Sequence, residues 1–374
     1  MTIIGTEPGE SEAVERLRAA GQEVHVARLM QPAALRRWQR RWRLTSIWLR
    51  GQYPWRTVWF WEPEIQRILD RLLAERRFDL VIAEDSAMGV YHYRTQAPTL
   101  LTEHEVRRAR PVDWHIGPPA NWLRWAFTES DWQRWRRYQP AVWRRFDRIQ
   151  VFTSRDADAI SLIAPELADR VRVNPFSIDL PPQADHCREK DDSIVFIGNF
   201  THAPNVDAAL WLGHEIMPLL RARRPGVQLT LIGNYPPDSV KALACEDILV
   251  AGRVPEVEPY LEQAAAVLAP IRIGGGMRMK VLQGMALGKA VVTTPRGAEG
   301  LAIDGQPLPL AIATDAKGIA SATIGLLACA DARRLLGQQA RAFVAEHYSA
   351  PAYARRLEAI YAEVFTNTQN RRPH

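Results

Sequence analysis

The strongest constraint on the fold of this chain is a regular alternation of strand-like and helix-like segments. Short apolar runs such as Gln228–Gly233 and Ile248–Gly252 are separated by amphipathic stretches such as Met277–Leu287. Consecutive strands that are joined through a helix run parallel to each other. The sequence therefore predicts an α/β protein in which helices cover parallel sheets.

The first half of the chain carries the pattern less regularly than the second half. Strands are expected at Thr2–Gly5, Glu23–Arg28, Leu80–Ala83, Thr99–Thr102 and Arg148–Thr153, and helices at Ser11–Ala20, Gln66–Arg77 and Trp132–Arg145. The stretch Gln31–Pro63 is expected to be helical and partly irregular.

The second half predicts a doubly wound domain, whose ligands bind beyond the carboxyl ends of the strands. Strands are expected at Ser193–Gly198, Gln228–Gly233, Ile248–Gly252, Ala266–Pro270, Ala290–Thr294 and Leu310–Thr314. Helices are expected at Asn205–Arg221, Pro237–Ala244, Val257–Gln263, Met277–Leu287, Asp315–Cys329, Asp331–His347 and Pro351–Phe365, with Asp315 and Ser349 as N-caps.

The 374 residues exceed what one hydrophobic core usually supports, so we expect two domains. The stretch Asp179–Asp192 contains two adjacent prolines and a polar run without apolar periodicity, which is typical of a linker. We therefore expect an N-terminal domain over residues 1–182, a C-terminal domain over 183–348, and a crossover helix and tail over 349–374.

A glycine-rich stretch of the second half carries most of the chemical information. A buried strand ends at Pro270, Gly274, Gly275 and Gly276 follow, and a helix is expected from Met277. Glycines let the backbone approach a ligand closely, and a helix N-terminus offers free N–H groups and a partial positive charge. Such a loop binds a diphosphate without a metal.

Charged and polar side chains accompany this loop. Helical spacing predicts that Lys280 and Gln283 share one face with Gly276, so that Lys280 neutralises phosphate oxygens and Gln283 bonds a ribose hydroxyl. Arg272 and Arg278 would each add a bidentate phosphate contact. The alternative is that the glycines form only a tight strand-to-helix connection and that Lys280 is solvated.

The run from Gly274 to Leu301 resembles the donor-binding segment of retaining GT-B glycosyltransferases, specifically the "group 1" family used in bacterial surface-polysaccharide synthesis. Further stretches resemble this family in order and spacing, namely Phe78–Glu84, Thr102–Val106, Arg145–Ile149, Phe196–Phe200, Pro204–Leu210 and Gly252–Leu261. The resemblance spans residues 64–365 and is stronger in the second half.

This resemblance implies the GT-B fold, in which two Rossmann-like doubly wound domains face a central cleft and the last helix crosses back to the first domain. It also implies retaining, metal-independent transfer of a sugar from a nucleotide-diphosphate sugar to a glycan or lipid-linked acceptor in cell-envelope polysaccharide synthesis. No cofactor beyond the donor substrate is expected, and no metal site.

The resemblance also assigns roles to residues of this chain. Catalytic contacts are implied for His104, Lys280 and Arg278, with His104 at the transferred sugar. Donor-binding positions are implied at Gly198, Asn199, Arg253, Val254, Arg272, Gly274, Gly275, Gly276, Gln283 and Glu299, where Arg253 and Val254 line the base pocket and Glu299 lies near its edge.

The chain departs from the family pattern at several of these positions. The family commonly carries two glutamates where this sequence has Gly275 and Gln283. A Gly-Arg and a Lys-Gly pair are replaced by Gly198-Asn199 and Pro204-Asn205, and the first strand is abbreviated. These departures motivate the alternative of a catalytically weak GT-B-fold partner protein in a polysaccharide-assembly complex. An epimerase on the same fold is conceivable, but the sequence shows no paired carboxylates positioned for proton abstraction.

Positive charge and tryptophan concentrate in the first half. Residues 1–190 carry 30 Arg and Lys against 25 Asp and Glu, and all 13 Trp except Trp211 precede residue 144. The stretches Arg36–Trp61 and Trp114–Arg145 interleave Arg with Trp. This pattern suits packed helices of an arginine-rich protein or peripheral contact with an anionic inner-membrane surface. Nucleic acid is the least favoured alternative.

The cysteines and the apolar runs bear on the compartment. Cys187, Cys245 and Cys329 lack the paired spacing of a zinc or thiol-exchange site, and an odd number favours a reducing compartment. The longest apolar runs are shorter than the roughly 20 residues that span a bilayer. We therefore expect a cytoplasmic protein without a signal peptide.

Overall fold

The chain folds into two compact units. The structure, a computed structural model, describes residues 1–7, 12–28, 42, 45–46, 48–51, 53–107, 122–182, 188–274, 278–303 and 305–369. The first unit comprises residues 1–151, 156–173 and 360–374, and the second comprises 152–155 and 174–359. The division at residue 173 precedes the expected boundary between 182 and 183.

The second unit is built on a six-stranded parallel sheet in the order β12-β11-β10-β7-β8-β9. Its strands are Lys190–Ile197 (β7), Gln228–Ile232 (β8), Ile248–Gly252 (β9), Ala264–Ala269 (β10), Ala290–Thr293 (β11) and Ala311–Ile312 (β12). The chain winds outward from β7 through β8 and β9, and then in the other direction from β10 through β11 and β12. The doubly wound expectation is confirmed, and the point where the winding reverses lies between β7 and β10.

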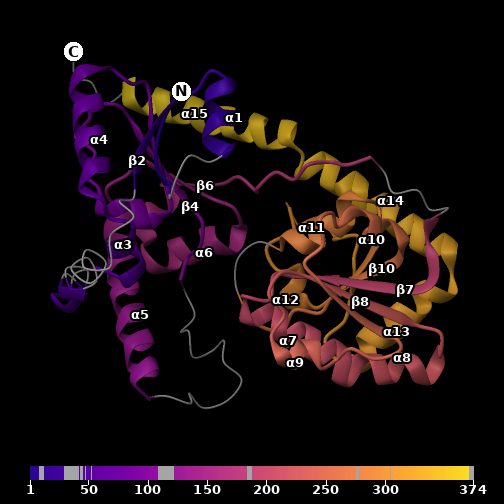
Figure 1. Cartoon of the computed structure of the whole chain (residues 1–374). Helices are drawn as coiled ribbons and strands as arrows, with labels where there is room; N and C mark the ends of the chain where they lie inside the picture. The colour runs from indigo at the N-terminus through magenta and orange to yellow at the C-terminus, as the bar shows by residue number, and fades with distance from the viewer. Residues whose placement is uncertain are drawn as a thin grey trace. The chain divides into compact units, whose positions relative to one another are not determined.

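Helices cover both faces of this sheet (Figure 1). One face carries α7 (Ala203–Trp211), a π-helical turn (Leu212–Ile216), α8 (Met217–Arg223) and α13 (Ala316–Ala328). The other carries α10 (Glu258–Gln263), α11 (Met279–Ala286) and α14 (Ala330–His347). The short helices α9 (Asp238–Lys241) and α12 (Pro295–Ala298) follow β8 and β11.

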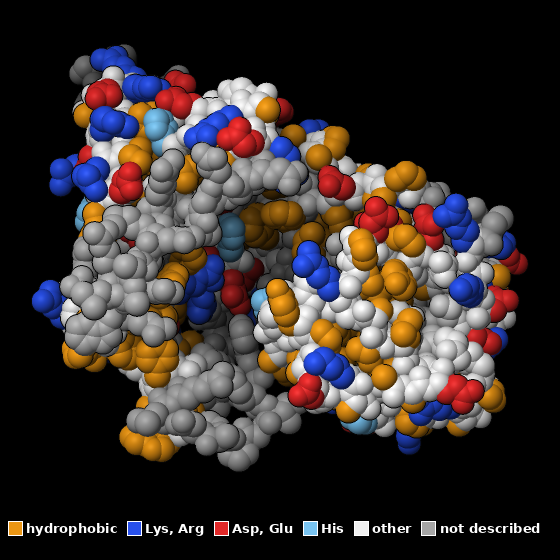
Figure 2. Space-filling view, in the orientation of Figure 1, with side chains coloured by type: hydrophobic (Ala, Val, Ile, Leu, Met, Phe, Trp, Pro, Cys, Tyr) orange, Lys and Arg blue, Asp and Glu red, His pale blue; other side chains and the backbone are white. Residues whose placement is uncertain are grey.

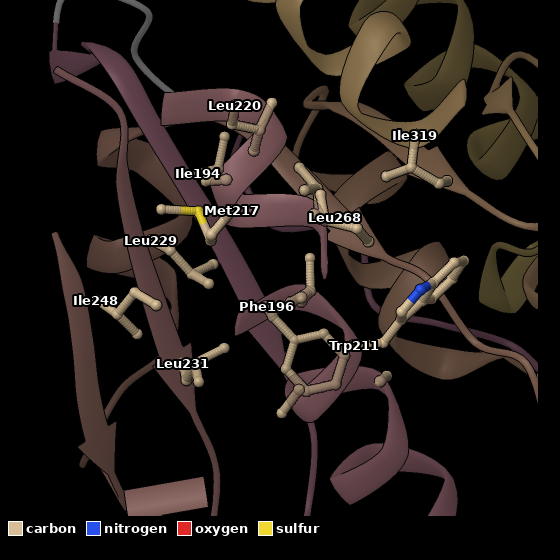
Figure 3. Packing of buried hydrophobic residues seen from close by; sticks show 14 of the residues in the cluster. Ile194, Phe196, Trp211, Met217, Leu220, Leu229, Leu231, Ile248, Leu268 and Ile319 are labelled. Carbon is tan, nitrogen blue, oxygen red and sulfur yellow. The ribbon is translucent and has the colours of Figure 1, made fainter. Parts of the chain in front are cut away.

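A continuous apolar core joins the first of these helical layers to the sheet. Phe196 of β7 and Leu268 of β10 are fully buried and lie in one cluster with Trp211 of α7 (Figure 3). Burial of each such side chain stabilises the fold by about 1.5–3 kcal/mol. This core therefore stabilises the strands whose carboxyl ends lead into the loops of the candidate site.

The described residues of the first unit form two parallel sheets. Strands β1 (Thr2–Glu7) and β2 (Glu23–Arg28) pair with each other, and β3 (Val81–Glu84), β4 (Thr99–Glu103), β5 (Arg148–Val151) and β6 (Val171–Val173) form the second sheet in that order. Its helices are α1 (Glu12–Ala19), α3 (Trp55–Phe60), α4 (Pro63–Glu75), α5 (Trp122–Trp143) and α6 (Ser154–Ile163), with 3-10 helices at Ser86–Val90 and Pro165–Arg170.

The last helix, α15 (Ala350–Gln369), is divided between the units at residue 360. Its second half belongs to the first unit, where Ile360 and Val364 pack against Leu100 of β4. The Glu363 carboxylate accepts a 2.7 Å hydrogen bond from Nε of Arg172 on β6. The helix thus has the crossover role that the family resemblance implies.

The boundaries of several elements differ from those expected. Strand β6 and helix α6 have no counterpart among the expected elements. The helix expected from Met277 begins at Met279, with Arg278 as its N-cap residue. Asp315 is an N-cap as expected, since its Oδ1 accepts a hydrogen bond from N of Gly318 at 2.7 Å. Most of the stretch Gln31–Trp48 lies outside the described residues.

The described tryptophans of the first unit range from buried to exposed. Trp135 and Trp143 on the second half of α5 are buried in its core. Aromatic side chains on the first half of α5 and nearby are exposed, namely Trp42, Trp59, Trp122, Trp125 and Phe127. Hydrophobic side chains are visible on this part of the surface in Figure 2. Within the described ranges, no helix is both long and apolar enough to span a bilayer.

Candidate functional site

The loops at the carboxyl edge of the six-stranded sheet bring most of the expected donor-binding residues together. Gly198 and Asn199 follow β7, Gly274 follows β10, and Lys280 lies in the first turn of α11. These are the two strands between which the winding reverses, where open α/β sheets place their ligand site. Gly275 and Gly276 lie outside the described residues.

Lys280 is the central cation of this edge. Its Nζ donates a hydrogen bond to Oδ1 of Asn205 in the first turn of α7, and lies 5.4 Å from the ring centroid of Phe196. Burial and the nearby positive charge of Arg278 lower the pKa of Lys280 to about 8. The ammonium is therefore held in place but is poorly compensated, which suits it to receive an anionic ligand.

Asn205 anchors this lysine to the loop after β7. Its side chain is 7% exposed, and its Nδ2 donates a 2.6 Å hydrogen bond to the carbonyl oxygen of Asn199. A Cβ added to Gly198 would lie 2.8 Å from Cγ of Asn205. Glycine is required at position 198 for this contact, so the loop backbone passes directly against the residue that holds Lys280.

The loop after β8 packs equally closely on the loop after β7. A Cβ added to Gly233 would lie 1.8 Å from the carbonyl oxygen of Gly198. The N–H of Gly233 donates a 2.8 Å hydrogen bond to the carbonyl oxygen of Gly252, the last residue of β9. This bond connects the loop after β8 to the start of the loop after β9. The three loops therefore form one connected backbone platform.

Arg278 stabilises the glycine loop through hydrogen bonds to backbone carbonyl groups. It is 8% exposed, its Nη2 donates to the carbonyl oxygen of Gly274 at 2.9 Å, and its Nε donates to that of Arg296 at 3.1 Å. Gly274 has φ +96°, and a Cβ there would lie 2.7 Å from Cγ of Pro204. In this structure Arg278 positions the loop after β10, and its contact with phosphate stays a prediction.

Arg272 is also engaged within the unit. Its guanidinium forms two hydrogen bonds with the Asp207 carboxylate, at 3.1 and 2.7 Å, and lies 4.5 Å from the ring centroid of Trp211. Such a bidentate pair neutralises much of the arginine's charge. Arg272 therefore strengthens the connection between the loop after β10 and α7.

The remaining expected positions of the second unit lie around this edge. Arg253 is exposed directly after β9, and the half-buried Val254 packs against the core cluster under α11. Gln283 is exposed one turn after Lys280 on α11. Glu299, after α12, pairs with Arg155 and Arg296 at 3.2 and 3.0 Å.

His104 belongs to the first unit, directly after β4. Its Nε2 lies 3.1 Å from Oε2 of Glu84 at the end of β3, and this contact raises the pKa of the imidazole. His104 and Glu84 thus form an exposed acid–base pair at the carboxyl edge of their own sheet.

A buried carboxyl group next to His104 was not anticipated from the sequence. Glu103 is 2% exposed and accepts hydrogen bonds from the Ser86 hydroxyl and, at 2.7 Å, from Nε1 of Trp143. Burial raises its pKa to about 7. The sequence signal that could have identified Glu103 as a buried carboxyl group was its position at the end of the apolar strand β4.

The structure thus gathers Gly198, Asn199, Gly274 and Lys280, with Arg272 and Arg278 as internal braces. Asn205 and Asp207 are the residues that sequence reasoning missed as partners of these cations. Within the described residues, no group of three or more His, Cys, Asp or Glu side chains is arranged to hold a metal.

Residues 191–329, from β7 to the end of α13, match the family model described as glycosyl transferases group 1. No curated protein sequence is significantly similar to the chain. The match covers the strands and loops that carry the Lys280 edge.

Solved structures resemble the chain over both units. Anabaena Alr3699/HepE in complex with UDP and glucose has a TM-score of 0.62 and 13% identity, over 96% of this chain and 91% of its own. The α,α-trehalose 6-phosphate synthase of Burkholderia multivorans has a TM-score of 0.62 and 12% identity, over 100% and 98%. S. aureus TarM has a TM-score of 0.60 and 12% identity, over 79% of this chain, which spans 57% of TarM. These similarities show the two-domain α/β fold, GT-B.

Proposed function

We propose that this protein is a glycosyltransferase that transfers a sugar from a nucleotide-diphosphate sugar to a glycan or lipid-linked acceptor. The observation that carries the proposal is the placement of Lys280 beside Asn205 and the Gly274 loop, at the reversal point of the doubly wound sheet. The match of residues 191–329 to the glycosyl transferases group 1 model supports it, as does the fold shared with a UDP- and glucose-bound protein.

The chemistry of the Lys280 edge fits the departure of a diphosphate. The bond between the anomeric carbon and the donor phosphate oxygen breaks, the acceptor hydroxyl adds to that carbon, and its proton is released. Negative charge grows on the leaving diphosphate, where the Lys280 ammonium and the backbone of the glycine loop stabilise it. Because a fixed cation performs this role, we propose that transfer is metal-independent.

The first unit supplies the groups proposed for the acceptor side. His104 and Glu84 form an ion pair at the end of β3 and β4, and the buried Glu103 fixes the same edge. We propose that His104 contacts the transferred sugar, that the anomeric configuration is retained, and that the pathway is cytoplasmic synthesis of a cell-envelope polysaccharide. The exposed aromatic side chains of α5 would then contact the inner membrane surface peripherally.

One observation favours a second candidate, a catalytically weak GT-B partner in a polysaccharide-assembly complex. Two of the three basic residues expected to bind phosphate are engaged internally, Arg272 with Asp207 and Arg278 with two backbone carbonyls. Gln283 adds no charge. Lys280 would then be the principal cation for a donor.

A screen of nucleotide-sugars separates the two candidates. Release of nucleoside diphosphate is measured for the wild type, for Lys280→Ala and for Lys190→Ala, an exposed lysine at the opposite end of β7. The enzyme predicts turnover that Lys280→Ala abolishes and Lys190→Ala retains. Turnover that is unchanged in Lys280→Ala removes this site, and thermal stabilisation by a donor without turnover supports the weak partner.

A further inference from the structure

Tyr235 combines an exposed side chain with an unfavourable backbone conformation. It follows β8 in the segment Gly233-Asn234-Tyr235-Pro236, its side chain is 75% exposed, and its φ is +55°. A non-glycine residue in the left-handed region is destabilised, and a following proline disfavours helical conformations further. An exposed tyrosine could relax this strain if nothing held it.

Both neighbouring loops hold Tyr235 in this conformation. On one side, the carbonyl oxygen of Asn234 accepts a 3.0 Å hydrogen bond from N of Phe200, after β7. On the other, N of Gly233 donates a 2.8 Å hydrogen bond to the carbonyl oxygen of Gly252, at the end of β9. The ring itself makes no hydrogen bond or ring contact with other residues in the described part of the chain. The fold therefore presents a strained, unpartnered aromatic ring, as expected of a binding residue.

The place of this ring in the sheet indicates the ligand group that it faces. The order β10-β7-β8-β9 puts Lys280 at the β10–β7 boundary, Tyr235 after β8 and the exposed Arg253 after β9. Neighbouring strands lie about 4.8 Å apart, so the end of β8, which leads to Tyr235, lies about 10 Å along the edge from the end of β10, which leads to α11 and Lys280. This separation is comparable to the reach of a nucleoside diphosphate from its terminal phosphate to its base.

We propose that Tyr235 stacks on the nucleobase of the donor and positions it beside Arg253. The inference rests on the proposed function, because it requires the diphosphate at Lys280. A flat π-face suits stacking on any base, so Tyr235 contributes affinity for the nucleoside, and Arg253 lies next to it at the end of the adjacent strand. The hydrogen bonds of the neighbouring residues fix the backbone that carries the ring, so less backbone freedom is lost on binding.

The test compares ligands with and without a base. UDP, GDP, ADP and inorganic pyrophosphate are titrated by calorimetry into the wild type and into Tyr235→Phe, Tyr235→Ala and Tyr235→Gly. The Phe variant keeps the π-face. The Gly variant removes the ring and relieves the backbone strain, so its melting temperature rises.

For the nucleoside diphosphate that the wild type binds best, we expect about tenfold weaker binding to the Ala and Gly variants. Phe is expected to bind within about twofold of the wild type, and pyrophosphate affinity to be unchanged in all variants. Equal nucleoside diphosphate affinity in the Gly variant overturns the inference, and so does an equal loss for pyrophosphate. If the wild type binds none of the diphosphates, the proposed function itself fails, which is a distinct result.

Discussion

The ammonium of Lys280 on α11 and the side-chain amide of Asn205 on α7 meet across the reversal point of the six-stranded sheet. The two helices follow different strands and pack on opposite faces of that sheet. Their contact therefore joins the two halves of the doubly wound unit at the position where such folds bind ligands. The amide also donates to the carbonyl oxygen of Asn199, so Asn205 links the lysine, α7 and the loop after β7 through hydrogen bonds.

Replacement of Asn205 by aspartate tests this contact. The added carboxylate raises the pKa of Lys280 above its value of about 8 and competes with a bound phosphate for the ammonium. We expect Asn205→Asp to weaken nucleoside diphosphate binding by about tenfold or more at pH 7.5, measured by calorimetry.

The matched control for this change is Gln228→Glu, the same amide-to-acid replacement at the exposed start of β8. It adds equal charge to the same unit at the opposite edge of the sheet. Similar losses in both variants would mean that net charge, and not the Lys280 contact, governs binding.

Replacement of Glu103 by glutamine tests the buried carboxyl of the first unit. Burial raises the pKa of Glu103 to about 7, above its ordinary value of 4.5. Between these pH values the folded state holds the proton more tightly than the unfolded state, so the free energy of unfolding falls as pH rises. We expect Glu103→Gln to lose this slope, with a change relative to the wild type of about 3 kcal/mol between pH 4.5 and pH 7.

Tryptophan fluorescence is the readout for this change, because all Trp but Trp211 precede residue 144. The exposed Glu75→Gln of α4 is the control and should retain the wild-type slope. A wild-type slope in Glu103→Gln would show that the carboxyl at position 103 does not titrate in this range.

Replacement of Gly233 by alanine tests the platform of loops. A Cβ at this position would lie 1.8 Å from the carbonyl oxygen of Gly198, so one of the two loops must shift. We expect Gly233→Ala to lower the free energy of unfolding by about 3 kcal/mol or more and to weaken nucleoside diphosphate binding.

Gly325→Ala is its matched control in the same unit. Gly325 lies inside α13 with open space around the added Cβ, so alanine should stabilise the helix by up to about 1 kcal/mol. Denaturant titration of both variants gives the comparison. Equal stabilities for the two would contradict the close approach of Gly233 to Gly198.

The sequence predicted the second unit closely because its strands are short, apolar and separated by distinct helices. Asp315 illustrates this, since a capping residue followed by an apolar run determines the helix start locally. Strand β6 was missed because Val171–Val173 is only three residues long and, among the strands that the structure describes, pairs with β5 alone. So short a segment has no periodicity to detect.

The sequence predicted which residues lie at the candidate site, but not which of them form hydrogen bonds and ion pairs with one another. Sequence spacing identified Lys280 as a cation near a glycine loop, but its partner Asn205 is 75 residues away. The two residues meet because α7 and α11 begin beyond the carboxyl ends of the neighbouring strands β7 and β10. Arg272 and Arg278 were expected to face a ligand, and the structure engages both with Asp207 or backbone carbonyls. Such tertiary competition for a side chain leaves no local signal.

The central claim is that the Lys280 ammonium binds the donor diphosphate, and the pH dependence of binding tests it most directly. The affinity for the best-binding nucleoside diphosphate is measured from pH 7 to pH 10 for the wild type and Lys280→Ala. Their ratio cancels the titration of the ligand itself. The pKa of Lys280 is about 8, so the wild-type affinity divided by that of Lys280→Ala should be large near pH 7, where the ammonium is charged. Above pH 8 the ammonium loses its proton, and this ratio should fall by up to tenfold per pH unit. A ratio near one at pH 7, or one that does not change with pH, would contradict the account.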